Sequence, residues 1–129
     1  GGVRIMKRII IADDSATARM FIKRCLEIIG LGDAEIIETE HGKEALSAAK
    51  EKPTDLLITD LNMPVMDGET LVKWVKSSPK LCDMPVVVVT SAGNPAKEAQ
   101  LIELGAHRVI NKPISPPVIM EALEKFIDN

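Results

Sequence analysis

Five short apolar runs, rich in isoleucine and valine, alternate along this 129-residue chain with segments of helical periodicity. Continuous apolar runs of this kind are typical of strands covered on both faces in a parallel sheet. The intervening segments repeat their apolar residues at three- and four-residue intervals, which indicates amphipathic helices. The expected strands are Lys7–Ala12, Ala34–Thr39, Asp55–Thr59, Pro85–Val89 and Arg108–Asn111.

Five helices are expected between and after these strands. Gly30 and Gly105 are expected to end two of them, since glycine commonly follows the last helical residue. Right-handed connections between successive parallel strands then give an α/β fold, a doubly wound five-stranded parallel sheet in a flavodoxin-like (βα)5 three-layer sandwich. The expected helices are Ser15–Ile29, His41–Glu51, Asp67–Ser77, Pro95–Leu104 and Pro116–Ile127. The inward-facing residues are expected to be Ala18, Phe21, Ile22, Cys25, Leu26 and Ile29 in the first helix, Ala45, Leu46 and Ala49 in the second, and Val118, Ala122, Leu123 and Phe126 in the fifth.

Length and composition favour one compact domain. A chain of this size buries about two-thirds of its unfolded surface and needs neither a disulfide nor a structural metal to fold. Cys25 and Cys82 lack metal-ligand spacing, so we interpret them as buried thiols of a reducing compartment. Sixteen basic and nineteen acidic residues give a net charge of −3, which disfavours a nucleic-acid-binding surface.

The sequence also lacks the apolar segments that direct a chain into or across a membrane. No apolar run approaches the roughly 20 residues that span a bilayer, and the first residues lack the apolar core of a signal peptide. We therefore expect a cytoplasmic protein without membrane insertion. The segment Gly1–Ile5 is interpreted as a remnant of cloning or of the start site, so the predicted domain is 6–129.

Polar side chains directly follow four of the predicted strands. Asp13 and Asp14 follow the first strand, Asp60 the third, Thr90 the fourth and Lys112 the fifth. The carboxyl ends of parallel strands share one edge of the sheet, where open α/β folds bind their ligands. Three carboxylates at such an edge favour a metal ion, whereas a hydroxyl and an ammonium group favour an anion.

Each of these residues also has a structural interpretation. Asp13 and Asp14, with the serine after them, could cap the following helix, and Asp60 could form a turn. Thr90 could simply end a strand, and Lys112 could lie in a solvated turn. The whole set is harder to explain in this way, because carboxylates about 4 Å apart repel by about 4 kcal/mol per pair at an effective dielectric constant of 20. A bound cation would offset that repulsion. His41 and His107 fall outside the set, and we expect both at the surface.

The segments IIIADDS, LLITDLNMPVMDG, VVVVTSAG, LGA and NKP together resemble the motifs of receiver domains of two-component response regulators. The resemblance extends over Met6–Asn129 and is to single-domain receivers of the chemotaxis type. It implies that Asp60 accepts a phosphoryl group from a sensor histidine kinase. It further implies a signalling switch, not an ordinary enzyme, which promotes its own Mg²⁺-dependent phosphorylation and dephosphorylation.

The resemblance also implies roles for the other residues of the set. Asp14, Asp60 and the backbone carbonyl of Asn62 would bind Mg²⁺ directly, and Asp13 would act through a water molecule. Lys112 would pair with Asp60 and then with the phosphoryl oxygens, to which the hydroxyl of the threonine after the fourth strand would hydrogen-bond. Phosphoryl transfer depends mainly on positioning and charge stabilisation, which these groups would supply. Hard oxygen ligands favour Mg²⁺, with Mn²⁺ as an alternative, over zinc.

Two positions depart from the family pattern. Val109 stands where chemotaxis receivers usually carry an aromatic residue, three positions before Lys112, and Ile114 stands where phenylalanine usually follows the lysine–proline pair. Both lie on the face of the fourth helix, fifth strand and fifth helix, the usual signalling surface of the family. We expect a downstream protein to bind this face, which contains Val109, Asn111 and Ile114, and the protein to be a monomer or a phosphorylation-dependent dimer.

Three functions remain open from the sequence. The first is a stand-alone switch, since the sequence shows no DNA-binding or effector module after the fifth helix. The second is a phosphatase of the haloacid dehalogenase type, which places its nucleophile and acid two residues apart on the first strand, unlike the adjacent pair here. The third is a phosphorylation-independent adapter, which would not need the complete set of polar residues.

Overall fold

The computed structural model describes residues 6–127, so the predicted remnant at 1–5 lies outside the described residues. Its five strands form one parallel sheet in the order β2-β1-β3-β4-β5. Each strand end falls within one residue of its predicted position, and Asp60 and Thr90 are the last residues of their strands. The strands are β1 (Arg8–Ala12), β2 (Glu35–Thr39), β3 (Leu56–Asp60), β4 (Val86–Thr90) and β5 (Arg108–Asn111).

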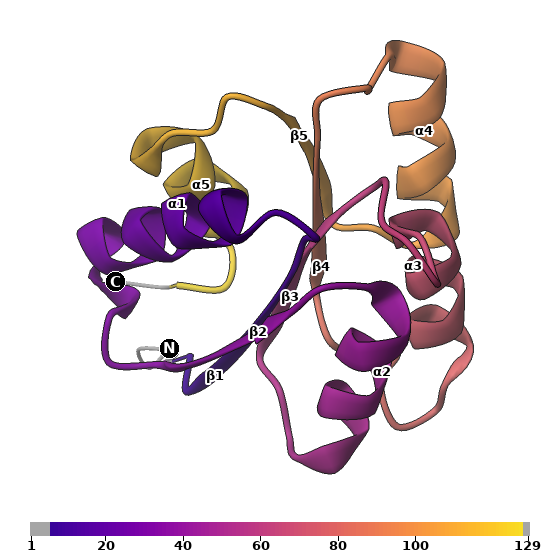
Figure 1. The fold of residues 1–129 in the computed structure, drawn as a ribbon, viewed down its shortest axis with the longest axis horizontal. Helices are drawn as coiled ribbons and strands as arrows, with labels where there is room; N and C mark the ends of the chain where they lie inside the picture. The colour runs from indigo at the N-terminus through magenta and orange to yellow at the C-terminus, as the bar shows by residue number, and fades with distance from the viewer. Residues whose placement is uncertain (1–5, 128–129) are drawn as a thin grey trace.

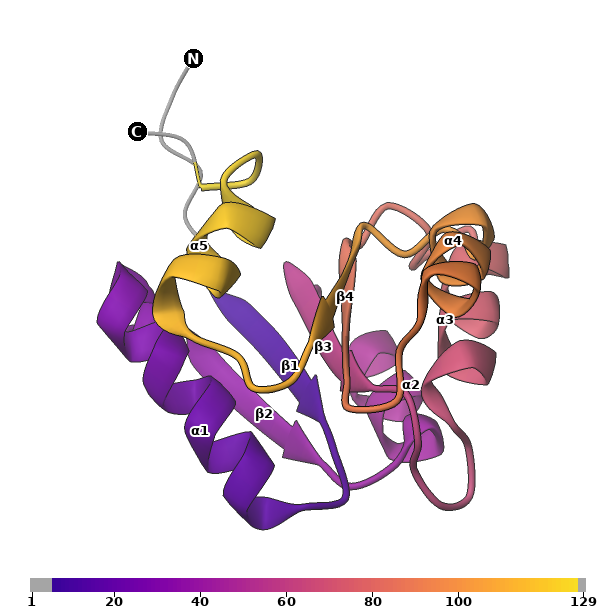
Figure 2. The same ribbon diagram turned by 90° about the horizontal axis from the view of Figure 1, so that it is seen from above.

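Helices cover both faces of this sheet. The helices are α1 (Ala16–Leu26), the π-helical turn η1 (Glu27–Leu31), α2 (Gly42–Glu51), α3 (Gly68–Ser77), α4 (Pro95–Leu104) and α5 (Pro116–Leu123). Figures 1 and 2 show α1 and α5 on one face and α2, α3 and α4 on the other. The predicted doubly wound three-layer fold is confirmed. Within residues 6–127, no helix combines the length and apolar character needed to cross a membrane.

The sheet divides the core into two clusters. Ile9 and Ile11 of β1 belong to the cluster under α1 and α5, and Ile10 and Ala12 belong to the cluster under α2, α3 and α4. This division follows from the two-residue period of a strand, which sends successive side chains to opposite faces. All five residues of β1, β3 and β4 are buried, as expected for the central strands of a doubly wound sheet.

Side-chain caps set the starts of the helices that surround the carboxyl edge of the sheet. Ser15 Oγ accepts the backbone N–H of Ala18 at 3.2 Å, and Asn94 Oδ1 accepts that of Lys97 at 2.9 Å. These caps satisfy backbone donors that have no partner within the first turn of a helix. Because Ser15 caps α1, that helix does not require the two preceding aspartates for capping.

The predicted end of the first helix is confirmed in position, but its last turn differs in type. The α-helix gives way after Leu26 to η1, and the backbone leaves helical geometry at Gly30, which has a φ of 96°. The predicted end of the fifth helix is wrong. The fifth was expected to reach Ile127 and ends at Leu123.

Two predicted inward positions are also wrong, because each lies beside the buried stripe of its helix. Phe21 is 50% exposed, and Val118 is exposed as well. Cys82 is half-buried, in contrast to the buried Cys25. The buried stripes are Ile22, Cys25 and Leu26 in α1, and Ile119, Ala122 and Leu123 in α5.

Candidate functional site

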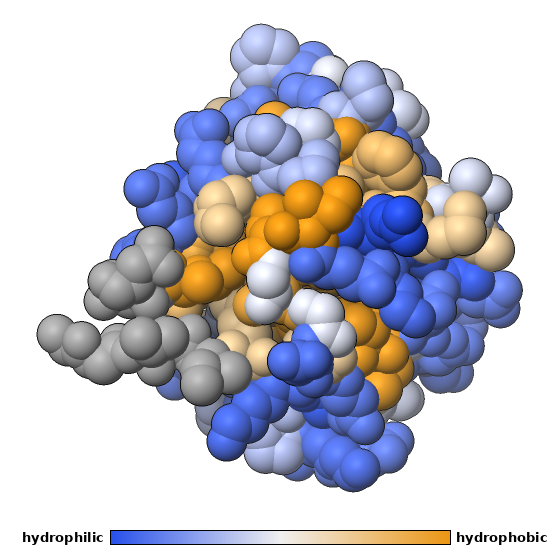
Figure 3. Space-filling model, turned by 90° about the vertical axis from the view of Figure 1, so that its left-hand side faces the viewer, coloured by the Kyte–Doolittle hydropathy of each residue, from blue (hydrophilic) through white to orange (hydrophobic). Residues whose placement is uncertain are grey.

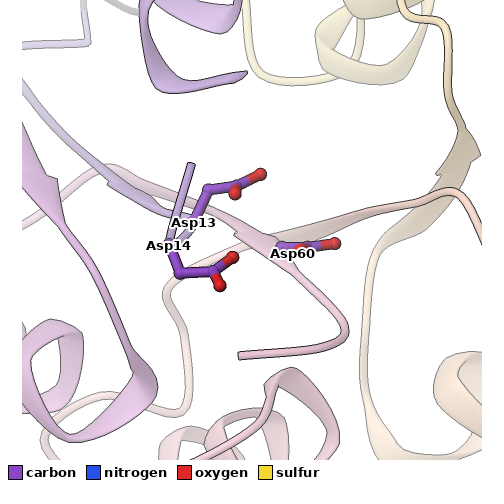
Figure 4. Close-up of side chains that lie close together, drawn as sticks. All are labelled: Asp13, Asp14 and Asp60. Carbon is purple, nitrogen blue, oxygen red and sulfur yellow. The ribbon is translucent and has the colours of Figure 1, made fainter. Parts of the chain in front are cut away.

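The strand order opens a space at the carboxyl ends of β1 and β3. The chain leaves β1 for β2 on one side and later returns to place β3 on the other side of β1, so the loops after β1 and β3 diverge. Asp13 and Asp14 begin the first loop, and Asp60 ends β3. One carboxylate oxygen from each of the three lies within 4.8 Å of the others. Figure 4 shows the three carboxyl groups directed to the same side.

The three acids differ in their contact with solvent. Asp13 is 1% exposed and Asp60 is 8% exposed, whereas Asp14 is open to solvent. Asp13 Oδ1 accepts the backbone N–H of Ser15 at 2.9 Å, which fixes the buried carboxylate within its loop. The cluster is therefore closed to solvent at Asp13 and Asp60 and open to solvent at Asp14.

Lys112 brings a positive charge into this acidic cluster from the loop after β5. Its Nζ lies 3.1 Å from Asp13 Oδ2 and 3.7 Å from Asp60 Oδ1. The backbone N–H of Lys112 donates to the carbonyl of Thr90 at 2.9 Å, which extends the pairing of β4 and β5 to this residue. One ammonium thus contacts two of the three carboxyl groups, Asp13 and Asp60, so the protein supplies fewer positive than negative charges here.

The pKa of Asp60 is raised, chiefly because burial disfavours its charged form and secondarily because Asp13 and Asp14 repel it. The Lys112 ammonium and the backbone N–H of Leu61, which donates to Asp60 Oδ1 at 2.9 Å, oppose this rise. Ionised Asp60 is therefore incompletely compensated by the protein itself. Hard carboxylate oxygens around one point fit a cation such as Mg²⁺. Asn62 lies in the exposed loop two residues beyond Asp60, and its role as a carbonyl ligand stays a prediction.

Thr90 lies at the buried floor of the loop between β4 and α4. Its Oγ1 accepts the backbone N–H of Ala92 at 3.0 Å. A Cβ added to Gly93 would lie 2.5 Å from Asn111 Oδ1 and 3.0 Å from Thr90 Cγ2. The loop therefore packs closely against the end of β5. A movement of the Thr90 side chain would displace the backbone of this loop near Gly93.

The expected signalling face needs one correction. Asn111 is exposed and Val109 is half-buried against the α2–α3–α4 side of the core. Ile114 is only 6% exposed because it packs into the cluster under α1 and α5. The prediction that a partner contacts Ile114 is therefore wrong for this conformation.

The two histidines lie outside the acidic cluster, but neither is fully at the surface. His41 is half-buried and its Nδ1 accepts the backbone N–H of Glu44 at 3.2 Å, which starts α2. His107 is also half-buried, with Nε2 3.1 Å from the carbonyl oxygen of Ala122. Both have structural positions that the sequence did not predict.

Three charged residues near the cluster were missed in the sequence. Arg19 of α1 donates from Nη1 to the backbone carbonyl of Asp13 at 2.6 Å. Lys97 and Glu69 form an ion pair at 2.8 Å that joins the first turns of α4 and α3. Arg19 had a usable signal, a basic residue one turn into the helix that follows the acidic pair. The Lys97–Glu69 pair required knowledge of which helices are neighbours.

A largely apolar cavity of about 390 Å³ borders the cluster between α1 and the loop after β5. Lys112 and Ser15 contribute to its lining beside the exposed ring of Phe21. Figure 3 views the side of the molecule that carries α1 and α5, where apolar surface lies among hydrophilic side chains.

Comparisons with known proteins agree with this arrangement. A family model for the response regulator receiver domain matches residues 9–124. The chain is 40% identical over 121 residues to the chemotaxis protein CheY homolog of Campylobacter jejuni, covering 93% of this chain and 92% of the relative. It is 37% identical over 118 residues to chemotaxis protein CheY1 of Helicobacter pylori, covering 91% and 94% respectively. The structure of the chemotaxis response regulator CheY4 of Vibrio cholerae superposes with a TM-score of 0.81 at 28% identity, over 95% of this chain and 99% of that one. A match of this extent, together with the acidic cluster and its lysine, shows that the chain belongs to the response regulator receiver family and is a CheY-like member of it.

Proposed function

We propose that this receiver domain accepts a phosphoryl group on Asp60 from a sensor histidine kinase and that the modification changes how it binds a downstream protein. The observation that carries the proposal is the position of Asp60. Its carboxylate lies at the end of a central strand, within reach of two further carboxylates and of the Lys112 ammonium at 3.7 Å.

The chemistry proposed is an in-line displacement at phosphorus. A carboxylate oxygen of Asp60 forms the new P–O bond while the P–N bond of a phosphohistidine breaks, and its electron pair stays on the imidazole nitrogen. Lys112 would stabilise charge on the phosphoryl oxygens, and Thr90 Oγ1 would exchange its backbone contact for one of those oxygens. The Leu61 N–H would hold the attacking carboxylate in place.

The proposed cation ligands are Asp14, Asp60 and the carbonyl of Asn62, with Asp13 acting through water. When bound, Mg²⁺ or Mn²⁺ would neutralise negative charge that develops on the phosphoryl oxygens. The buried Asp13 would then keep its contact with Lys112 and orient the ammonium toward the reacting group.

Phosphoryl labelling tests the proposed function. With Mg²⁺ and a small phosphodonor such as acetyl phosphate, intact-mass spectra should show one added phosphoryl group, and chelation of the metal should abolish it. Peptide mapping after borohydride reduction should place the group on Asp60. Absence of any labelling, or labelling at another residue, would reject the proposal.

Mg²⁺ should stabilise the fold, because it offsets repulsion within the acidic cluster. The free energy of unfolding should rise by about 2.7 kcal/mol when free metal is 100 times its dissociation constant. Asp14→Ala should abolish the rise, whereas Asp33→Ala, at an exposed acid before β2, should retain it. Thermal or urea unfolding with and without millimolar Mg²⁺ measures the effect. Equal stability of the wild type under both conditions would contradict the cation assignment.

We further propose that the signal leaves the site through the loop after Thr90. A modification shifts a conformational equilibrium only through contacts that differ between the two states. Val109 is branched at Cβ and has few rotamers, so it cannot swing a long side chain between buried and exposed positions. The close packing of Gly93 against Thr90 and Asn111 supports transmission through this loop to α4.

Thr90→Ala should uncouple the loop from phosphorylation. Beryllofluoride with Mg²⁺, which mimics the phosphoryl group, should shift backbone amide resonances over residues 91–104 in the wild type. The alanine variant should lose most of these shifts while Asp60 remains modifiable, whereas Val109→Ala should keep them. A wild-type response confined to the neighbours of Asp60 would contradict this route.

The partners are proposed at the level of their chemistry. A phosphohistidine-bearing kinase would be the donor, and a downstream protein would bind the face of α4, β5 and α5. A groove of about 240 Å³ on this face, lined in part by Val109, Asn111 and Val118, is a place for such contact.

A further inference from the structure

The guanidinium of Arg19 connects three parts of the chain at the edge of the acidic cluster. Its Nη1 donates to the backbone carbonyl of Asp13 at 2.6 Å, and its Nε donates to Glu38 Oε1 on β2 at 3.1 Å. The Arg19 side chain is only 12% exposed. Two charge-assisted contacts from a nearly buried, planar group indicate a fixed position.

The carbonyl that Arg19 binds belongs to the peptide that joins Asp13 to Asp14. Pairing of β1 with β2 ends just before it, since Ala12 opposite Thr39 is the last paired residue of β1. The N–H of Asp13 still donates to the carbonyl of Thr39 at 3.0 Å. The next backbone acceptor, the carbonyl of Asp13, is bound by the Arg19 guanidinium instead of by β2, and this hydrogen bond fixes the plane of the Asp13–Asp14 peptide. The orientation of that peptide sets where the chain carries Asp14.

We propose that Arg19 is a positioning residue for the cation site, acting through the backbone between Asp13 and Asp14. The proposal rests on the proposed function in that these acids hold a divalent cation. Arg19 does not contact the carboxyl groups of the site. Glu38 accepts a hydrogen bond from Nε and so orients the planar guanidinium, whose Nη1 donates to the Asp13 carbonyl. Loss of the Arg19 guanidinium would let the Asp13–Asp14 peptide rotate and carry the Asp14 carboxylate away from the other two carboxylates.

Charge and positioning make opposite predictions for this residue. As a positive charge close to a cation site, Arg19 alone would weaken Mg²⁺ binding, so its loss would strengthen binding. As a positioning group, it strengthens binding, so its loss would weaken it. The sign of the change in affinity therefore separates the two roles.

The experiment is a calorimetric titration of the whole chain with Mg²⁺ alone. Arg19→Lys keeps the charge but cannot hold the carbonyl and the carboxylate in one planar fork, and Arg19→Gln removes the charge as well. Both variants should bind Mg²⁺ about tenfold more weakly, the lower range of effects seen when groups that orient metal ligands are lost. Arg24→Gln, an exposed arginine on the same helix, should leave the affinity unchanged. Amide hydrogen exchange at Asp14 without metal should speed up in both Arg19 variants and not in the Arg24 control.

Each outcome decides the proposal. Equal affinity in the Arg19 variants and the wild type, tighter binding by Arg19→Gln, or no Mg²⁺ binding by the wild type would overturn it. If an Arg19 variant does not fold, Glu38→Gln, which leaves α1 unchanged, should still weaken Mg²⁺ binding, and unchanged binding would overturn the proposal. Phosphoryl labelling is not a readout here. A wild type that binds Mg²⁺ but takes no phosphoryl group would contradict the proposed function and leave the Arg19 result valid.

Discussion

Asp60→Asn is expected to accept no phosphoryl group, even at phosphodonor concentrations that label the wild type completely. An amide lacks the anionic oxygen that attacks phosphorus, and the other acids lie on the loop after β1, in different positions relative to Lys112. Intact-mass spectra with acetyl phosphate and Mg²⁺ measure the loss. Glu40→Gln, an exposed acid beyond β2, is the matched control and should label normally. Equal labelling of the Asp60 variant would reject Asp60 as the acceptor.

The same substitution should also stabilise the metal-free fold at neutral pH. The pKa of Asp60 is raised in the folded state, mainly by burial and then by Asp13. A group with a raised folded pKa contributes stability that is present below its unfolded pKa, about 3.9, and is lost as pH rises through the folded pKa. The amide introduced by Asp60→Asn cannot ionise, so the advantage of the variant should grow from acidic toward neutral pH in EDTA. A difference that shrinks as pH rises would contradict the electrostatic account.

Gly68→Ala is expected to damage both the fold and the site. A Cβ at this position would lie 2.2 Å from the carbonyl oxygen of Asp60 and 2.9 Å from Leu61 Cα. Both are backbone atoms and cannot move aside as a flexible side chain could. Overpacking of this kind costs about 1–3 kcal/mol of folding free energy or more. We also expect slower phosphorylation, because relief of the clash would displace the backbone of Asp60, the proposed acceptor.

Gly32→Ala provides the matched control for this effect. Its added Cβ would approach no closer than 3.6 Å to the side chain of Glu27, and Gly32 has an ordinary helical φ of −64°. Urea unfolding should therefore show a large loss of stability for Gly68→Ala and little change for Gly32→Ala. Similar losses in the two variants would show that general glycine replacement, and not the contact with Asp60, is responsible.

The strands and the polar residues at their ends could be predicted because the signals are local. The apolar runs are short and rich in isoleucine, valine and leucine, and four of them are followed directly by a polar residue of the site, so strand ends shifted by no more than one residue. Lys112, far from Asp13 in sequence, could be placed beside it because parallel strands deliver their carboxyl ends to one edge.

The errors arose where helix packing decides the outcome. The exposure of Phe21 depends on how far α1 is rotated against α5 and the sheet, and apolar spacing left that angle open. The burial of Ile114 depends on the path of the loop after β5, which turns it under α5. The place of Arg19 one turn after the acidic pair was a usable local signal for its contact with Asp13, whereas its second contact, to Glu38 of β2, forms only when β2 pairs beside β1.

Helix α4 is attached to the rest of the domain by few side chains. Leu101 is its single fully buried residue, whereas α3 buries Leu71, Val72 and Val75 in addition to its first glycine. Burial of one leucine contributes about 1.5–3 kcal/mol, and one hydrogen bond to a charged group contributes about the same amount. The proposed contact between Thr90 and a phosphoryl oxygen would therefore be on the same energy scale as the burial of Leu101. If the signal follows the proposed route, one new hydrogen bond would be enough to shift the position of α4 without a bulky rotating side chain.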